Sequence, residues 1–153
     1  MTSELHQAIA VRLKNGEGRY TRPRRDLIDA LLMAGKPVTA EEILAMAPHL
    51  PLSSIYRNLA VFEETGLVHR VAGHGEFGRF ELAEEFVGHH HHFACATCGA
   101  VTDVELPEGL ESDLDNGLAR LAAERGFQVL SHRLDVVGRC SGCAAGERAR
   151  PVR

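Results

Sequence analysis

The chain has 153 residues, of which 44% are hydrophobic and 25% charged, and it carries a formal net charge of -4. This length suits one ordinary domain or two small ones, and the composition excludes a largely disordered chain. No apolar run reaches the ~18 residues of a membrane span, and the charged N-terminus lacks the apolar core of a signal peptide, so we expect a cytoplasmic protein without a membrane partner.

The first half of the sequence has the hydrophobic period of helices. Thr39 with Glu42 three residues later forms a capping box, which predicts a helix start. Thr21 is expected to cap the helix before it, while Gly35 and Gly66 stand where helices should end. Four helices are predicted: residues 3–14, 22–34, 39–47 and 53–65.

After Gly66 the hydrophobic period changes to two, which predicts strands. LVHRV (67–71) and RFELA (79–83) are the strands, and the glycines of AGHGEFG (72–78) suit a hairpin loop. Three or four short helices followed by a β-hairpin are typical of a winged helix-turn-helix, with the helices at 39–47 and 53–65 as the helix-turn-helix. Residues 1–83 are therefore expected to form a winged-helix DNA-binding domain.

A short connection, residues 84–88, is expected to act as a hinge before a second domain at 89–145. The second domain is predicted to hold strands 89–95, 100–106 and 127–137 and a helix at 108–125. That helix carries an apolar stripe of Leu110, Leu114, Leu118 and Leu121. The fold class is thus α+β, a winged helix-turn-helix followed by a small α/β domain, with residues 146–153 as a disordered tail.

The four cysteines form two Cys-x-x-Cys pairs, Cys95 with Cys98 and Cys140 with Cys143. Two such pairs that meet in space make the tetrahedral thiolate cage of a structural zinc site. A redox dithiol site is the alternative, but such a site would need only one Cys-x-x-Cys pair, at the start of a helix. We therefore expect structural Zn(II) at these four residues.

Four consecutive histidines precede the first cysteine pair. On an extended strand, His89 and His91 point to one face and His90 and His92 to the other, so the tract can serve two metal sites. His69 and Glu81 on the wing strands could complete the site of His90 and His92. His132, with Asp115 or Glu111, could complete the other. A polar loop of unpaired histidines is the plainer alternative, and we interpret His6, His49 and His74 as surface residues.

A basic cluster lies between residues 12 and 25, with six Lys or Arg residues and a single acid. A charge run alone usually indicates a solvated surface, but a neighbouring helix-turn-helix favours phosphate contacts. On the predicted recognition helix the outward positions include Ser54, Tyr56 and Arg57, which can contact base edges and phosphates.

SSIYRNLAVFEETGLV, HHHHFACATCGAV and HRLDVVGRCSGC occur in this order and closely resemble the ferric uptake regulator (Fur) family of bacterial metal-responsive repressors. The resemblance covers roughly residues 10–144. It implies a winged-helix DNA-binding domain, a C-terminal dimerisation domain and a homodimer that binds palindromic double-stranded operator DNA when loaded with metal.

The resemblance also assigns residues. It places a structural zinc site at Cys95, Cys98, Cys140 and Cys143, and a regulatory hinge site at Glu81, His90 and His92, with His69 where zinc-sensing members have an aspartate. It places a second site at His89, His91, His132 and Asp115, with Glu111 as the alternative carboxylate. It assigns DNA contacts to Arg19, Tyr56 and Arg57, and the neighbouring Arg22 and Ser54 are expected to join them.

The expected function is therefore a metal-dependent repressor of metal-homeostasis genes. A site of three histidines and one glutamate suits Zn(II) or Fe(II), with Ni(II) or Mn(II) as further candidates. The iron-type histidine of the first domain is replaced by Pro37, and zinc-type members commonly have cysteine at Glu81. The alternative is a peroxide-sensing repressor of the same fold. A zinc hydrolase is disfavoured because no H-E-x-x-H or other catalytic signature accompanies the histidines, so we do not expect an enzyme.

Overall fold

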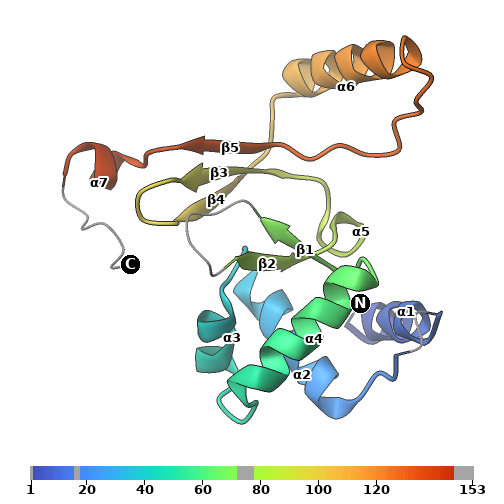
Figure 1. The fold of residues 1–153 in the computed structure, drawn as a ribbon, viewed down its shortest axis with the longest axis vertical. Coiled ribbons are helices and arrows are strands. Elements are labelled where there is room, and N and C mark those ends of the chain that lie inside the picture. The colour runs from blue at the N-terminus through green and yellow to red at the C-terminus, as the bar shows by residue number, and fades with distance from the viewer. Residues whose placement is uncertain (1, 16–17, 72–77, 147–153) are drawn as a thin grey trace.

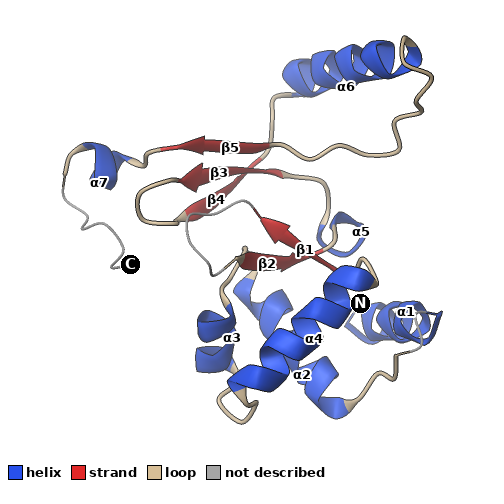
Figure 2. Cartoon of the chain, viewed as in Figure 1, coloured by secondary structure: helices blue, strands red, loops and turns tan. Residues whose placement is uncertain are grey.

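The computed structural model describes residues 2–15, 18–71 and 78–146, which form two lobes joined at the wing (Figure 1). One lobe contains four helices and a two-stranded sheet, and the other a three-stranded sheet with an outlying helix, so the predicted α+β class is confirmed (Figure 2). The elements are α1 (Thr2–Asn15), α2 (Arg22–Ala34), α3 (Ala40–Met46), α4 (Leu52–Glu64), β1 (Val68–Val71), β2 (Arg79–Leu82), α5 (Glu84–Val87), β3 (His91–Cys95), β4 (Val101–Val104), α6 (Glu108–Ala123), β5 (Asp135–Gly138) and α7 (Ser141–Ala144).

The helix starts and stops of the first lobe follow local sequence signals. The capping box before α3 is confirmed: the Glu42 backbone N–H donates to Thr39 Oγ1 at 3.2 Å and the Thr39 N–H donates to Glu42 Oε2 at 2.9 Å. Thr21 stands at the N-cap of α2, but its side chain makes no capping hydrogen bond. Gly66, with φ of 67°, follows the end of α4 as predicted.

The core of the first lobe forms where the apolar faces of its helices meet. Ile55, Leu59 and Phe62 of α4 are at most 1% exposed, so these three residues form the inward face of that helix. Burial of this face against the other helices supplies the hydrophobic stabilisation of the lobe. The remaining fully buried members come from every neighbouring element and include Ile9, Leu13, Leu27, Ile28, Ile43 and Leu67.

Strands β1 and β2 pair antiparallel in a register that sets His69 opposite Glu81. The turn before α3 joins this sheet, because Val38 and Phe80 exchange two backbone hydrogen bonds of 3.0 and 2.8 Å. The wing is therefore attached to the start of the helix-turn-helix. The hairpin loop at 72–77, including His74, lies outside the described residues.

The second lobe is built on β3, which lies between β4 and β5. It pairs antiparallel with β4 and parallel with β5, so the chain must cross over through α6 to reach β5. The predicted strand at 127–137 is wrong over most of its length, since only Asp135–Gly138 is a strand. Phe127 and Leu130 before it are 75% and 88% exposed, and among the described residues no strand pairs with this segment.

Smaller differences separate the predicted and observed bounds of the other elements of this lobe. The strands predicted at 89–95 and 100–106 are confined to β3 and β4, where backbone pairing exists, and α6 stops two residues before the predicted end. The connection at 84–88 contains a short helix, α5. The expected tail beyond Gly146 lies outside the described residues.

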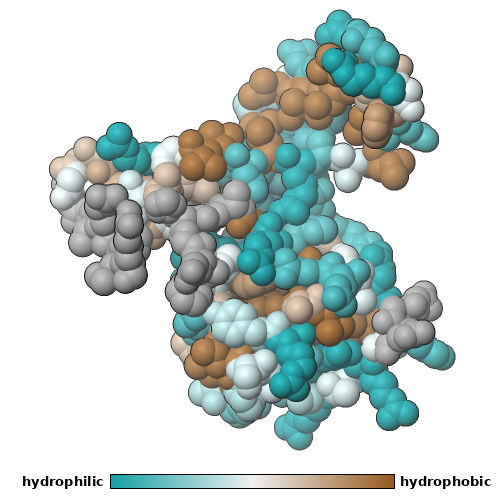
Figure 3. Space-filling view, in the orientation of Figure 1, coloured by the Kyte–Doolittle hydropathy of each residue, from teal (hydrophilic) through white to brown (hydrophobic). Residues whose placement is uncertain are grey.

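Helix α6 stands apart from the rest of its own chain (Figure 1). None of its residues is buried, and Leu110 and Leu121 of the predicted apolar stripe are 54% and 51% exposed. Hydrophobic surface gathers around this helix in Figure 3. Across the described ranges, no helix is both long and apolar enough to cross a bilayer.

Candidate metal centres

Three groups of side chains place their ligand atoms within 4.8 Å of one another in the described part of the chain. One contains four cysteines, and the other two divide the histidine tract between them. We name these the cysteine cluster, the hinge cluster and the second cluster. Their members are Cys95, Cys98, Cys140 and Cys143; Glu81, His90 and His92; and His89, His91, Glu111 and His132, respectively.

The cysteine cluster joins the end of β3 and its turn to the start of α7. All four predicted thiols come together, and Cys98 Sγ lies 3.8 Å from Cys140 Sγ. Four sulfurs ~2.3 Å from a tetrahedral Zn(II) would lie about 3.8 Å apart, so the donor set and its spacing fit zinc. Backbone N–H groups of Cys140, Cys98 and Thr97 point at the Cys95 sulfur and lower the pKa of that thiol to about 5, which favours the thiolate that a metal requires.

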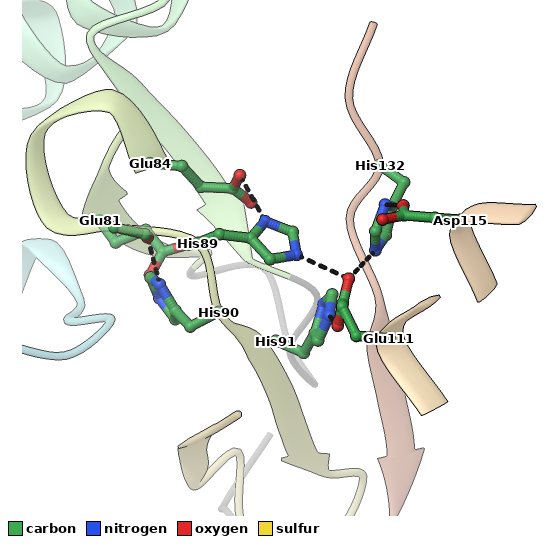
Figure 4. Close-up of polar contacts among 9 residues, drawn as sticks. Glu81, Glu84, His89, His90, His91, Glu111, Asp115 and His132 are labelled. Atoms are coloured by element: carbon green, nitrogen blue, oxygen red, sulfur yellow. Dashed lines mark hydrogen bonds and ion pairs between the residues drawn. The ribbon is translucent and has the colours of Figure 1, made fainter. Parts of the chain in front are cut away.

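The hinge cluster forms where the wing meets β3 (Figure 4). Glu81 Oε2, on β2, lies 3.1 Å from both His90 Nε2 and His92 Nε2. Burial would raise the pKa of Glu81, but hydrogen bonds and charge from the two histidines outweigh it and lower the pKa. Ligands ~2.1 Å from a tetrahedral ion would lie about 3.4 Å apart, so this buried carboxylate and these imidazoles fit a divalent metal.

The fourth residue predicted for the hinge, His69, does not join this cluster. It stands opposite Glu81 on β1, yet the three ligand atoms that converge belong to Glu81, His90 and His92. Burial and the nearby charge of Arg133 lower the pKa of His69. The prediction rested on the closeness of the wing strands to the linker and on the family resemblance, but pairing with Glu81 across the sheet does not bring the His69 ring to the shared point.

Asp103 lies beside the hinge cluster and was not predicted from the sequence. Its Oδ1 lies 3.8 Å from His92 Nε2, because the β3–β4 register pairs the two residues directly. The only local signal was an acidic residue in a strand that follows the histidine tract. Its proximity to the cluster depends on strand register, which the sequence does not show.

Glu111 of α6 lies at the centre of the second cluster (Figure 4). Its Oε1 is 3.2 Å from His89 Nε2 and 3.0 Å from His132 Nε2, and its Oε2 is 2.9 Å from His91 Nε2. The carboxylate first predicted here, Asp115, lies outside: its Oδ1 is 3.1 Å from His132 Nδ1, on the other side of the ring. The structure thus brings together the alternative, Glu111, with all three predicted histidines.

The predicted division of the histidine tract agrees with this geometry. His89 and His91 face α6, while His90 and His92 face the wing, although the regular strand begins only at His91. The chain is extended enough before β3 to keep the alternation of faces. The four rings of the tract are therefore divided between two carboxylates, Glu111 and Glu81.

The interpretation of His6 as a surface residue is wrong. It is 5% exposed, its Nδ1 is hydrogen-bonded to the Tyr20 hydroxyl, and its Nε2 lies 2.9 Å from Asp29 Oδ1. Burial, followed by the charge of Asp29, raises the pKa of Tyr20 to about 12. His49 is exposed as expected and lies 2.9 Å from Asp26 Oδ2.

The predicted DNA contacts lie on or near the helix-turn-helix. Arg19, Arg22, Tyr56 and Arg57 are exposed, whereas Ser54 is half-buried. The Tyr56 hydroxyl donates to Glu41 Oε1 of α3 at 2.9 Å, which fixes the ring direction.

Part of the basic cluster has a structural role instead. Arg12 forms two hydrogen bonds of 2.7 and 2.9 Å with the Glu85 carboxylate of α5. Arg24 Nε donates to Asn58 Oδ1 of α4 at 3.0 Å. Positive charge for phosphate contacts is therefore smaller than the sequence count indicates.

Comparison with known proteins supports a regulator. The model of the "Ferric uptake regulator family" matches residues 15–137. The "Peroxide operon regulator" of Bacillus subtilis (strain 168) is 31% identical over 149 residues, covering 94% of this chain and 96% of the relative. The "Ferric uptake regulation protein" of Neisseria meningitidis (strain Z2491) is also 31% identical, over 138 residues, covering 87% and 91%.

A solved structure confirms the fold. The crystal structure of the Vibrio cholerae ferric uptake regulator, described as revealing a rearrangement of its DNA-binding domains, superposes with a TM-score of 0.65 at 27% identity. The match covers 84% of this chain and 96% of that one.

Proposed function

The chain belongs to the ferric uptake regulator family, whose members are transcriptional regulators rather than enzymes, and we propose that it is a metal-dependent repressor. It binds palindromic operator DNA as a homodimer in the cytoplasm when its hinge cluster holds a divalent metal. The genes under its control serve metal homeostasis.

One observation carries this proposal: the hinge cluster takes its ligands from both lobes. Glu81 belongs to the wing, whereas His90 directly precedes β3 of the other lobe and His92 lies in it, and Glu81 Oε2 is within hydrogen-bond distance of both rings. A divalent cation bound there supplies positive charge that draws the carboxylate and the two imidazoles together. Their mutual distance then sets the angle between wing and second lobe, which selects one conformer.

The DNA-reading surface responds to that angle. The wing is hydrogen-bonded to the segment before α3 through Val38 and Phe80, so we expect the wing and the helix-turn-helix to move together. Tyr56 and Arg57 of α4 are exposed for contact with a major groove. In a dimer, two α4 helices held about one DNA turn apart would enter successive major grooves.

The second copy of the dimer is expected on α6 and the segment after it. Leu110, Leu121, Phe127 and Leu130 are more than half exposed, an apolar area that a single chain leaves in water. Burial of such a face is typical of obligate homodimers.

The donor set favours Zn(II) or Fe(II) at the hinge, with Ni(II) and Mn(II) as further candidates. Two imidazoles and one carboxylate suit each of these ions, and Asp103 supplies a second carboxylate 3.8 Å from His92. The cysteine cluster is assigned to structural Zn(II), because four thiolates prefer that ion.

A peroxide-sensing repressor is the second candidate. It is favoured by the relative from Bacillus subtilis, named a peroxide operon regulator and as similar as the ferric uptake relative. Peroxide treatment of the Fe(II)-loaded protein, followed by mass spectrometry, distinguishes the two. Added oxygen on His90 or His92 supports peroxide sensing, and unmodified histidines support a plain metal sensor.

The test of the main proposal is operator binding with and without metal. A duplex selected from a random library by the metal-loaded protein serves as the operator. A shift of the binding-competent form from about 1:99 to 99:1 needs ~5.5 kcal/mol of preference for that form. Glu81→Ala should abolish metal stimulation, whereas His49→Ala, an exposed histidine outside the clusters, should preserve it. Equal operator affinity in both metal states would overturn the proposal.

A further inference from the structure

All five clustered histidines present the same ring nitrogen to the centre of their cluster. Each directs its Nε2 at the central carboxylate of its cluster, Glu81 or Glu111, at 2.9 to 3.2 Å. In each ring, Nδ1 then points away from the shared centre. Four of these five Nδ1 atoms have a partner on that far side, whereas His91 Nδ1 has none among the described residues.

In the second cluster, two carboxylates occupy that far side. Glu84 Oε2 lies 2.8 Å from His89 Nδ1, and Asp115 Oδ1 lies 3.1 Å from His132 Nδ1 (Figure 4). Glu84 belongs to α5 and Asp115 to α6, so the two supports come from different elements.

The hinge cluster has the same arrangement. Asp135 Oδ1 lies 2.9 Å from His92 Nδ1, with the two residues paired in the β3–β5 register. The Gly88 carbonyl lies 2.9 Å from His90 Nδ1 and serves the other ring. His92 is only 3% exposed, so the Asp135 contact lies in a largely dry environment, where a hydrogen bond to a carboxylate is strong.

An imidazole has one proton and one lone pair in its neutral form. When Nδ1–H donates to an outer carboxylate, the lone pair is left on Nε2, directed at the cluster centre. The outer group therefore fixes both the tautomer and the direction of the ring, and it makes the ligand nitrogen more basic.

We propose that Glu84 and Asp115 are positioning residues of the second cluster and that Asp135 is the positioning residue of the hinge cluster. This inference rests on the proposed function, because it assumes that both clusters bind metal. It gives Asp115 a role outside the ligand set, orienting His132 from behind while Glu111 faces the centre.

The supports also connect each cluster to a further element. Glu84 ties His89 to α5, whose next residue, Glu85, is bonded to Arg12 of α1. Asp135 ties His92 to β5. Metal in the second cluster should therefore steady α5, and metal in the hinge cluster should steady the β3–β5 pair.

A crossed experiment separates the two assignments. Two parent proteins are made. Glu81→Ala keeps only the second cluster intact, and Glu111→Ala keeps only the hinge cluster intact. Glu84→Gln and Asp135→Asn are then each added to both parents. Co(II) affinity is measured by visible ligand-field absorbance, with zinc retained in the cysteine cluster. Glu85→Gln is the matched control, because it neutralises the neighbouring residue without touching a clustered histidine.

Glu84→Gln should weaken Co(II) binding about 10- to 100-fold in the Glu81→Ala parent and leave the Glu111→Ala parent unchanged. Asp135→Asn should do the reverse, and Asp115→Asn should behave as Glu84→Gln does. Hydrogen exchange of α5 should slow on Co(II) binding in the Glu81→Ala parent, and this slowing should be smaller with Glu84→Gln.

Unchanged affinity in every combination, or equal losses in both parents, would overturn the positioning roles. The unfolding temperature of each metal-free variant shows whether a substitution damages the fold in general. Such damage would lower Co(II) affinity in both parents, and that result would count against the assignment. Parents that bind Co(II) at neither cluster would overturn the proposed function as well, which makes the two failures distinguishable.

Discussion

Arg79 Nε donates a hydrogen bond of 2.7 Å to the backbone carbonyl of Gly99, which joins the wing to the turn that carries Cys98. The same guanidinium reaches the first lobe, where Nη1 donates to the Pro37 carbonyl at 3.1 Å and to Glu42 Oε2 at 2.7 Å. One side chain thus connects the wing, the start of the helix-turn-helix and the cysteine cluster. It is 18% exposed, so water competes weakly for these contacts.

Arg79→Met should lower the free energy of unfolding by about 2 kcal/mol, because it removes hydrogen bonds from a charged donor and leaves partly buried acceptors unpaired. Urea unfolding of the metal-free protein measures the change. Arg70→Met is the control: that arginine is 53% exposed and pairs with Glu63, so its loss should cost about 1 kcal/mol or less. Equal effects of the two substitutions would mean that Arg79 does not hold the lobes together.

Protonation of Glu42, the glutamate of the capping box, should lower the free energy of unfolding at acidic pH. Burial would raise its pKa, but hydrogen bonds from the Thr39 backbone and from Arg79 outweigh burial and lower the pKa below 4.5. A lowered carboxylate pKa stabilises the fold above the unfolded-state pKa and loses that contribution as pH falls through the folded-state pKa. The stability difference between wild type and Glu42→Gln should therefore be constant above about pH 5 and shrink below pH 4.5. Parallel unfolding curves across that range would contradict this pairing.

Cys95→Ser should remove structural zinc and destabilise the second lobe, since metal binding and folding are coupled in such small units. A loss of about 3 kcal/mol corresponds to a fall of about 10 °C in Tm for a chain of this size. Calorimetry and metal analysis measure the two effects. Wild type stripped of zinc by a chelator is the matched comparison and should unfold at the same temperature. A variant that keeps one zinc per chain would show that the four thiols do not act together.

Arg57→Ala should lower operator affinity without changing metal content, because Arg57 is exposed on α4 and belongs to none of the three clusters. If Arg57 contacts a base edge, the loss is about 1–3 kcal/mol with relaxed specificity, and if it contacts a phosphate, the salt slope falls by about 1. Fluorescence anisotropy over a range of salt concentrations separates these outcomes. Loss of metal in this variant would instead show that DNA binding and metal binding are assigned to the wrong residues.

Leu121→Glu should shift the protein from dimer to monomer, since it places a charge on the exposed apolar face of α6. Analytical ultracentrifugation at micromolar concentration is the measurement. Val11→Glu, on α1, is the control because Val11 is 61% exposed and outside this face. A dimer that survives Leu121→Glu would place the interface elsewhere.

Local features of this protein were predictable from its sequence. The capping box at Thr39 and the glycine after α4 act within a few residues, so they mark helix ends wherever the helices later pack. The division of the histidine tract followed from the two-residue period of an extended chain, and the pairing of the cysteines followed from the ligand number of zinc.

Contacts between distant segments were decided only in three dimensions. Glu111 and Asp115 lie four residues apart on one helix face, and the position of the strand bearing His91 selects Glu111 for the centre and leaves Asp115 behind His132. The β3–β4 register brings Asp103 to His92, and His6 is buried where it meets Tyr20 and Asp29, which are distant from it in sequence.

Sequence period and capping describe the conformation of each segment because they depend on neighbours along the chain. Which segments meet depends on the summed burial of apolar faces and on strand register, to which every element contributes. The residue types able to hold metal were therefore visible in the sequence, whereas the carboxylate at each centre, and the groups behind four of the five rings, were settled by how the lobes pack.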